Sequence, residues 1–174
     1  MKIRRITPSD DAAHAGDLVQ QAYFTLPGYE RDPDYDVTLA DVTGRDGEAE
    51  VIVAELDGTL VACLTFVPGI GHEHFEFDDP EACSFRYFGV DPAVQGRGVG
   101  EAMVRWCIDE GRRRGRRRLR IHTLTSMIGA QQLYAKLGFR RTPEFDEDWG
   151  GIIGLAFVLE LDRLGGGEIG GRST

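Results

Sequence analysis

Three glycines alternate with other residues at the centre of the chain, between an apolar run that ends at Val90 and an amphipathic segment that begins at Val99. They are Gly96, Gly98 and Gly100. A glycine carries no side chain over its backbone N–H group, and the first N–H groups of a helix have no acceptor within the helix. The helix dipole also favours negative charge at this end. The segment therefore predicts a loop that binds a phosphate group.

The spacing excludes two familiar phosphate-binding loops. A dinucleotide-binding G-x-G-x-x-G loop that began at Gly96 would need a third glycine at position 101, which is Glu101. A Walker A loop needs a glycine followed by Lys and then by Ser or Thr, and no glycine in this segment is followed by them. The pattern that remains is Gln95-Gly96-Arg97-Gly98-Val99-Gly100.

This hexapeptide resembles the [QR]-x-x-G-x-[GA] pyrophosphate-binding loop of the GNAT superfamily, the N-acetyltransferases that use acetyl-coenzyme A. A second segment, residues 129–139, resembles the A-x-x-L-Y-x-x-x-G-F motif of the same superfamily. Its apolar residues share one helical face, and Gly138 is a natural helix terminator. Two motifs in the correct order make the resemblance specific, and it extends over roughly residues 1–161. The alternative is a glycine-rich turn that has no ligand.

The resemblance implies acetyl-CoA as a co-substrate and no metal. In this superfamily, the strand before the loop pairs with the amides of the pantetheine arm, and the loop N–H groups bind the pyrophosphate. A strand N–H group, here that of Val90, polarises the thioester carbonyl. The cofactor-binding residues that the resemblance implies are Phe88, Gly89, Val90, Gln95, Gly96, Arg97, Gly98, Val99, Gly100 and Tyr134.

Tyr134 matches the position from which many relatives protonate the departing thiolate. A phenol with a reference pKa near ~10 keeps its proton at neutral pH and can donate it. We therefore predict Tyr134 as the general acid, the alternative being a tyrosine that only packs in the core. Met127 departs from the family pattern, because many relatives carry at this position an Asn that contacts the cofactor.

A base is needed, because only about one amine in a thousand is neutral at pH 7 when its pKa is about 10. Many relatives carry a Glu on the strand before the loop, at the position that Ser84 occupies here. We take Glu81 as the catalytic base to be tested, acting directly or through water. Glu76, His72 and His74 are the alternatives.

The pattern predicts a single α/β domain over residues 1–163, followed by a flexible glycine-rich tail over residues 164–174. A strand, a helix and a second strand around the glycine loop indicate a crossover with parallel strands, and the hairpins make the rest of the sheet antiparallel. The expected fold is therefore a mixed, mostly antiparallel sheet with helices on both faces. The resemblance implies that the central parallel strand pair is splayed to admit the pantetheine arm.

The expected elements can be placed along the chain. Asp57-Gly58 predicts the turn of a hairpin. The expected strands cover residues 3–6, 50–56, 60–67, 83–90, 119–124, 139–141 and 153–161. The expected helices cover residues 15–23, with Thr7 or Ser9 as the cap, a short segment near 35–42, and residues 99–114 and 129–137.

Charge is unevenly distributed in this chain of net charge −9, because seven arginines lie between Arg112 and Arg120. A basic run can bind nucleic acid. This one starts at the C-terminal end of a predicted helix, about 20 Å from the glycine loop, where cations suit the helix dipole. We expect a solvated face or an oligomer contact, with nucleic-acid binding as the alternative.

Acidic clusters at residues 30–36 and 144–148 lie in regions that border the acceptor cleft in relatives. Negative walls would attract a cationic amine, so we expect such an acceptor. The alternative is that these acidic residues only solvate the surface.

The leading function is the transfer of an acetyl group from acetyl-CoA to a primary amine of a small molecule or peptide, by direct attack in a ternary complex. A module that binds acyl-CoA without turnover is an alternative, because the strand Glu is missing. The sequence has no apolar signal segment and no bilayer-spanning run, and its three cysteines form no C-x-x-C pair. We therefore expect a cytoplasmic enzyme with no membrane partner, with Cys107 in the core, and a homodimer is a further expectation.

Overall fold

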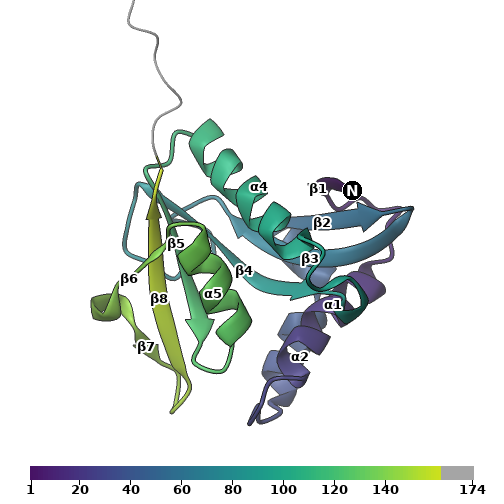
Figure 1. The fold of residues 1–174 in the computed structure, drawn as a ribbon, viewed down its shortest axis with the longest axis horizontal. Coiled ribbons are helices and arrows are strands. Elements are labelled where there is room, and N and C mark those ends of the chain that lie inside the picture. The colour runs from purple at the N-terminus through teal and green to yellow at the C-terminus, as the bar shows by residue number, and fades with distance from the viewer. Residues whose placement is uncertain (162–174) are drawn as a thin grey trace, which may run out of the picture.

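The computed structural model describes residues 1–161, so the expected flexible tail at residues 164–174 lies outside the described residues. Within them, one sheet has the strand order β1-β2-β3-β4-β5-β8-β6, with β7 paired to β8 (Figure 1). The strands are Lys2–Arg5 (β1), Glu50–Leu56 (β2), Thr59–Val67 (β3), Ala82–Val90 (β4), Arg118–Leu124 (β5), Arg140–Arg141 (β6), Glu147–Asp148 (β7) and Ile153–Glu160 (β8). The helices are Ala12–Phe24 (α1), Pro33–Ala40 (α2), Val42–Glu48 (α3), Val99–Arg113 (α4) and Ile128–Lys136 (α5).

The predicted strands and the helices now labelled α4 and α5 are present, with bounds that differ by at most one residue. The Asp57-Gly58 hairpin turn is confirmed, and both residues have a positive φ, 52° and 82°. The segment near 35–42 forms two short helices, α2 and α3, and β7 was not predicted. Strands of two residues, such as β7, are too short to produce a sequence period.

The predicted cap of the first helix was wrong. Asp11 caps α1, because its side chain accepts a hydrogen bond from the N–H group of His14 at 3.0 Å. Thr7 and Ser9 lie in the preceding turn, where their hydroxyl groups contact each other at 2.9 Å. Several residues with good capping side chains follow one another here, so the residue types alone do not select the cap.

Helices cover both faces of the sheet, as expected. α1, with α2 and α3 beside it, packs on one face, and α4 and α5 pack on the other. Along β2, Val51 and Val53 are buried on the α1 side and Ile52 on the α4 side, which is the two-residue period of a strand. Cys107 is fully buried in the core beneath α4, as predicted, and all three cysteines are free and buried.

The central parallel strands pair over only a short length. β4 and β5 share two backbone pairs, Ala82 with Arg118 and Cys83 with Leu119. Beyond these pairs the two strands run apart, β5 downwards and β4 to the right in Figure 1. β4 keeps β3 as its partner and β5 keeps β8, so each strand is paired on its outer side. The expected splay is therefore present, as a V-shaped gap that is closed at the β4 N-terminus.

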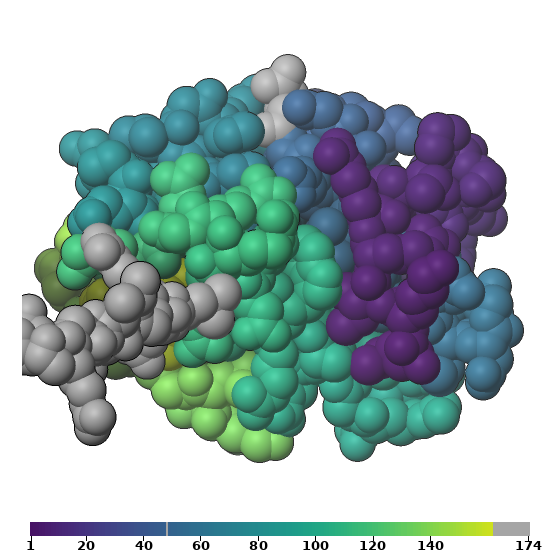
Figure 2. Space-filling view, turned by 90° about the horizontal axis from the view of Figure 1, so that it is seen from above, coloured from purple at the N-terminus to yellow at the C-terminus, as the bar shows by residue number. Residues whose placement is uncertain are grey.

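An ion cluster holds the closed end of the gap. The buried carboxylate of Asp79 accepts two hydrogen bonds from Arg118, at 2.7 and 2.8 Å, and one from Arg120 at 2.7 Å. Arg118 also lies 3.2 Å from Glu81. Asp79 precedes β4 and the arginines belong to β5, so these bonds join the two strands where their pairing begins. Figure 2 shows the segment before β4 (blue-green) against the corner between α4 and β5 (green).

The other arginines of the run between Arg112 and Arg120 also have partners among the described residues. Arg112 pairs with Asp109, Arg113 and Arg114 with Glu110, and Arg114 with Glu50; Arg116 donates to the carbonyl oxygen of Pro80, and Arg117 lies 3.7 Å from Glu81. The run therefore makes intramolecular contacts, while Arg113 and Arg117, whose side chains are 66% and 53% exposed, also lie on a solvated face as expected. The structure gives no support to nucleic-acid binding.

We expect Asp79→Asn to destabilise the fold, because the change leaves two guanidinium groups without their buried counter-ion. Removing one partner from such a cluster costs about 2–3 kcal/mol, or a fall in Tm of about 4–12 °C, measured by thermal unfolding. Glu81→Gln is the matched control, since this half-exposed carboxylate contacts the same arginines and its loss should cost less than about 1 kcal/mol. Equal losses in the two variants would contradict this role for Asp79.

The same contribution should depend on pH. The hydrogen bonds from Arg118, with those from Arg120, hold the pKa of Asp79 far below its usual value. The unfolded chain therefore binds more protons than the folded chain below about pH 4, and stability is lost as the pH falls. The difference in unfolding free energy between the wild type and Asp79→Asn should be full at pH 7 and should shrink below about pH 4.

Candidate active site

Two cavities occupy the gap between β4 and β5. The outer groove, about 860 Å³, lies at the N-termini of α4 and α5 and is also lined by the end of α1 and the residues after it. The inner pocket, about 80 Å³, lies deeper between the two strands. Phe88, Met127 and Ala130 line both cavities, so the groove and the pocket adjoin.

The glycine loop leaves an open helix N-terminus in the outer groove. Gly98 caps α4 with φ +80° and no side-chain hydrogen bond, and Gly96 has φ +77°. A Cβ atom at either position would meet nothing within 4 Å, so the conformation requires glycine while the space above it is open. An anion could approach these N–H groups without obstruction.

The structure divides the six loop residues into two groups. The N–H groups of Gln95 and Arg97 already donate to the carbonyl oxygens of Pro92 and Val94, at 3.3 and 3.2 Å. The first intrahelical bond of α4 runs from Ala102, so the N–H groups before it have no acceptor in the helix. In the loop and the first turn of α4, the N–H groups of Gly96, Gly98, Val99, Gly100 and Glu101 have no acceptor among residues 1–161.

The carboxylate nearest to this loop is neutralised. Glu101, in the first turn of α4, lies 2.6 Å from Lys136 and 2.8 Å from Arg105. The hydrogen bond from Lys136, followed by that from Arg105, lowers the pKa of Glu101. Its negative charge is therefore balanced by two cations that an anion at the helix N-terminus would also meet.

The open edge of β4 faces the gap at Val90. The N–H group of Asp91 donates to Val61 of β3 at 2.8 Å, so the backbone of Asp91 points towards β3. Backbone groups alternate along a strand, which turns the N–H and C=O groups of Val90 towards the gap and those of Gly89 towards β3. Gly89 instead serves packing, because a Cβ atom there would lie 2.1 Å from the Leu18 carbonyl oxygen of α1.

Tyr134 lies at the junction of the core and the inner pocket. Its ring packs against Phe85, Phe139 and Phe157, with centroid distances of 6.0, 5.5 and 6.0 Å. The residue also lines the inner pocket, and burial raises the pKa of its hydroxyl group above the ordinary value. Tyr134 is therefore protonated at neutral pH, and packing in the core does not remove it from the pocket.

Three charged side chains meet at the inner pocket. Glu76, from the segment before β4, lies 2.8 Å from Nη2 of Arg86 on β4 and 3.0 Å from Nδ1 of His122 on β5. The cluster therefore bridges the two splayed strands at the pocket. Arg86 and His122 did not emerge from our sequence analysis, although a lone ionisable residue in an apolar strand is a usable signal for Arg86.

The surroundings of His122 favour its charged form. Its Nε2 lies 2.9 Å from the carbonyl oxygen of Phe145, which can only accept, and its Nδ1 faces the carboxylate of Glu76. The imidazolium form can donate to both acceptors, which a neutral ring cannot do. Burial lowers the pKa of His122, but the hydrogen bonds to Glu76 and Phe145 outweigh it, and the net shift is upward.

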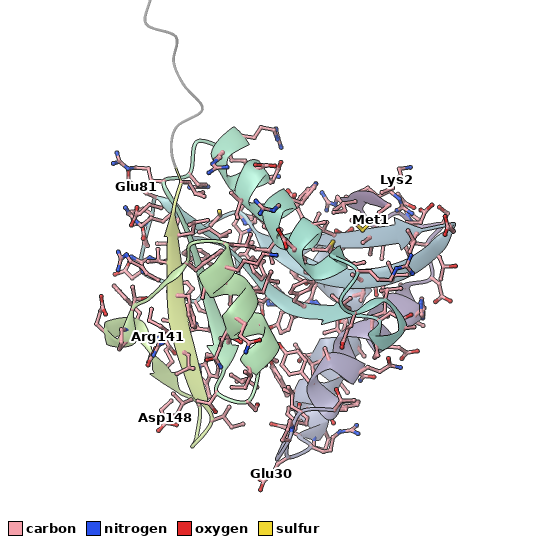
Figure 3. The ribbon with its side chains drawn as sticks, in the orientation of Figure 1. Met1, Lys2, Glu30, Glu81, Arg141 and Asp148 are labelled. Carbon is pink, nitrogen blue, oxygen red and sulfur yellow. The ribbon has the colours of Figure 1, made fainter. Side chains whose placement is uncertain are left out.

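The structure does not bring Glu81 to either cavity. It is half exposed at the closed end of the gap, where it contacts Arg117 and Arg118. Figure 3 shows Glu81 at the upper edge of the molecule, opposite Glu30 and Asp148 at the lower edge. Among the base candidates from the sequence, only Glu76 lines the inner pocket.

The remaining positions singled out by the sequence also have defined places. Ser84 is buried in β4 and lines neither cavity, and His72 and His74 line neither cavity. Met127 lines both cavities, and its sulfur accepts a hydrogen bond from Thr123 at 3.4 Å.

The acidic clusters face away from the inner pocket. Asp36 is buried beside Arg31 at 2.5 Å, and Asp146 pairs with Arg141 at 2.7 Å. Figure 3 shows Glu30 pointing outward from the lower edge. No acidic residue of either cluster lines the inner pocket as the structure describes it, and their role as negative walls beside an acceptor stays a prediction.

A splayed parallel strand pair, an open helix N-terminus and a pocket between the two strands together define the class of protein: a single-domain acetyltransferase fold. The chain belongs to the acetyltransferase (GNAT) family, whose model matches residues 17–139. No curated protein matches the chain in sequence. In residues 1–161 no helix has the length and apolar character needed to cross a membrane.

Solved structures share this fold. One is yncA of Salmonella typhimurium, a putative acetyltransferase determined with its cofactor acetyl-CoA, at 24% identity over 92% of this chain and 94% of that chain, with a TM-score of 0.66. A GCN5-related N-acetyltransferase from Kribbella flavida has 22% identity over 92% and 97%, with a TM-score of 0.67. The ribosomal-protein-alanine N-acetyltransferase of Brucella melitensis has 20% identity over 92% and 100%, with a TM-score of 0.64.

We expect Gly98→Ala to weaken coenzyme A binding by about tenfold or more, because a Cβ atom would stand over the open N–H groups and disturb their geometry. Gly115→Ala is the matched control. Gly115 lies just beyond the other end of α4 with φ +70° and similarly open space, so the backbone strain should be alike. Calorimetric titration with coenzyme A should separate the two variants, and equal affinities would contradict a role for this loop.

Proposed function

We propose that the protein transfers the acetyl group of acetyl-CoA to a primary amine, by direct attack of the amine in a ternary complex. One observation carries the proposal: the groove with the open helix N-terminus adjoins the pocket that Tyr134 lines. Two adjoining cavities suit a long phosphorylated thioester, whose two ends need different surroundings. Family membership supports acetyl transfer in general.

The outer groove fits the coenzyme end of acetyl-CoA. The free N–H groups of the glycine loop and the dipole of α4 would bind the pyrophosphate. The groove also has an apolar wall that includes Phe88 and Leu133, and the open edge of β4 at Val90 would pair with the amides of the pantetheine arm. These are the contacts that a phosphorylated thioester with a flexible arm requires.

The chemistry would take place where the groove meets the inner pocket. The amine nitrogen attacks the thioester carbon, a C–N bond forms and the C–S bond breaks. The N–H group of Val90 would stabilise the carbonyl oxygen as it gains negative charge. The hydroxyl group of Tyr134 would give its proton to the departing thiolate, and the proton that the attacking nitrogen releases as the amide forms would return to Tyr134 through water.

Deprotonation of the amine needs a different account from the one that the sequence suggested. Glu76 is already engaged by Arg86 and His122, and Glu81 lies outside the pocket. With His122 charged, the two cations outnumber the carboxylate of Glu76, and the excess positive charge lowers the pKa of a bound ammonium, which increases the neutral fraction that can attack. We propose that the amine loses its proton to water with this electrostatic help.

A thiol-release assay with acetyl-CoA over a panel of primary amines tests the function. We expect release that depends on both the amine and the enzyme, and an acetylated amine detectable by mass spectrometry. Binding of acetyl-CoA without release for any amine would favour the module without turnover. Absence of acetyl-CoA binding in calorimetry would overturn the proposed function altogether.

Tyr134→Phe should lower kcat by about tenfold or more, within the range typical of proton-transfer groups, because the thiolate loses its donor. The ring stays in place, so the affinity for acetyl-CoA should be unchanged and serves as the control. The measurement is steady-state acetylation between pH 6 and 9. An unchanged rate over that range would remove Tyr134 from the mechanism.

The cytoplasmic location and the homodimer that we expected from the sequence stay predictions. Sedimentation of the purified full chain would decide the oligomeric state.

A further inference from the structure

The inner pocket has an uneven balance of charge. The described residues that line it include one carboxylate, Glu76, and two cationic groups, Arg86 and His122. Both ring nitrogens of His122 face acceptors, which favours its charged form. With His122 in that form, the lining carries one net positive charge before any acceptor enters.

Arg86 has donors to spare. Its Nη2 lies 2.8 Å from Glu76, and its Nη1 makes a long contact of 3.5 Å with the carbonyl oxygen of His74. A guanidinium group has five N–H donors, and residues 1–161 provide no further acceptor for this one. The side chain is 21% exposed and lines the pocket, so the remaining donors are available to a ligand there.

The wall opposite His122 adds neutral hydroxyl groups. Tyr23 of α1 and Tyr35 of α2 line the pocket, and their rings meet edge to face with a centroid distance of 6.0 Å. Burial raises the pKa of Tyr23 to about 12, and that of Tyr35 is raised as well. Both are protonated at neutral pH, so this wall provides hydroxyl donors and no negative charge.

Acidic groups outside the pocket do not reverse this balance. Asp36 and Asp146 are each paired with an arginine of their own segment. Glu147 on β7 contributes to the raised pKa of His122, but it is exposed and lies outside the lining. A small acceptor in the pocket would meet the unpaired donors of Arg86 first.

We propose that the acceptor is a small primary amine that also carries a carboxylate, such as an amino acid, and that Arg86 selects it by binding that carboxylate. The fork of a guanidinium group matches the two oxygens of a carboxylate. The inner pocket is about one tenth of the volume of the outer groove, which favours a small acceptor. This inference rests on the proposed function, and it replaces the cationic amine that the acidic clusters suggested.

The first test compares amines that differ only in the carboxylate. The matched sets are L-leucine, L-leucinamide and 3-methylbutylamine, and L-phenylalanine, L-phenylalaninamide and phenethylamine, each assayed for thiol release with acetyl-CoA. The amides have the lowest amine pKa, so they would react fastest if the neutral fraction alone decided the rate. We expect kcat/KM for the amino acid to exceed that of both partners by about tenfold or more in at least one set.

The second test changes Arg86. Arg86→Gln should lower kcat/KM for the amino acid by about 10–100-fold, mainly through KM, and should change that for the decarboxylated amine by less than about threefold. Arg86→Lys should recover part of the loss, because it restores the charge without the fork. Arg140→Gln is the control, an exposed arginine on β6 that lines neither cavity.

The outcomes separate this inference from the proposed function. Acetylation of plain amines or amides in preference to amino acids overturns the inference and leaves the enzyme an acetyltransferase. A panel in which no amino acid reacts overturns it too, and calorimetry with acetyl-CoA then decides the proposed function. An equal loss of kcat/KM for the amino acid and the decarboxylated amine in Arg86→Gln, with Tm and acetyl-CoA affinity unchanged, would show that Arg86 does not bind the carboxylate. If Arg86→Gln fails to fold, Arg86→Lys and the wild-type panel decide whether the enzyme selects its acceptor by the carboxylate.

Discussion

The early end of pairing between β4 and β5 is the constraint on which the rest of the site depends. Two parallel strands that paired along their full length would leave no room between them, and the backbone groups at Val90 would be used within the sheet. Here the strands share two residue pairs, and each then continues with its outer partner alone. The unpaired edge, the outer groove and the inner pocket all arise from that separation.

A gap of this kind costs backbone hydrogen bonds, so the strands must be held by something else. At the closed end, Asp79, just before β4, binds Arg118 and Arg120 of β5. At the pocket, Glu76 joins Arg86 and His122 across the same strands. Both acidic residues belong to the segment between β3 and β4. Asp79 holds this segment to β5 at the closed end, and Glu76 bridges β4 and β5 at the pocket. Only the second bridge faces a cavity, which is why its charges bear on the acceptor.

Much of the fold could be predicted because its signals are local. The hairpin at Asp57-Gly58 depends on two adjacent residues that accept a positive φ, and the glycine loop depends on three alternating glycines. The role of the arginine run could not be predicted in the same way. The structural role of Arg118 and Arg120 depends on Asp79, which lies 39 and 41 residues away along the chain. A basic run on a solvated face has the same local sequence.

The sequence by itself determined the order of the elements, the open N-terminus of α4 and the position of Tyr134 on a helix that ends at Gly138. These depend on backbone conformation and helical period, which act between near neighbours. Only the tertiary structure decided which charged residues share a cavity: it placed Glu81 at the closed end, brought Glu76 to Arg86 and His122, and left the acidic clusters outside. The physical reason is that the meeting of charges depends on how far the strands separate, and that distance is set by packing on both faces of the sheet.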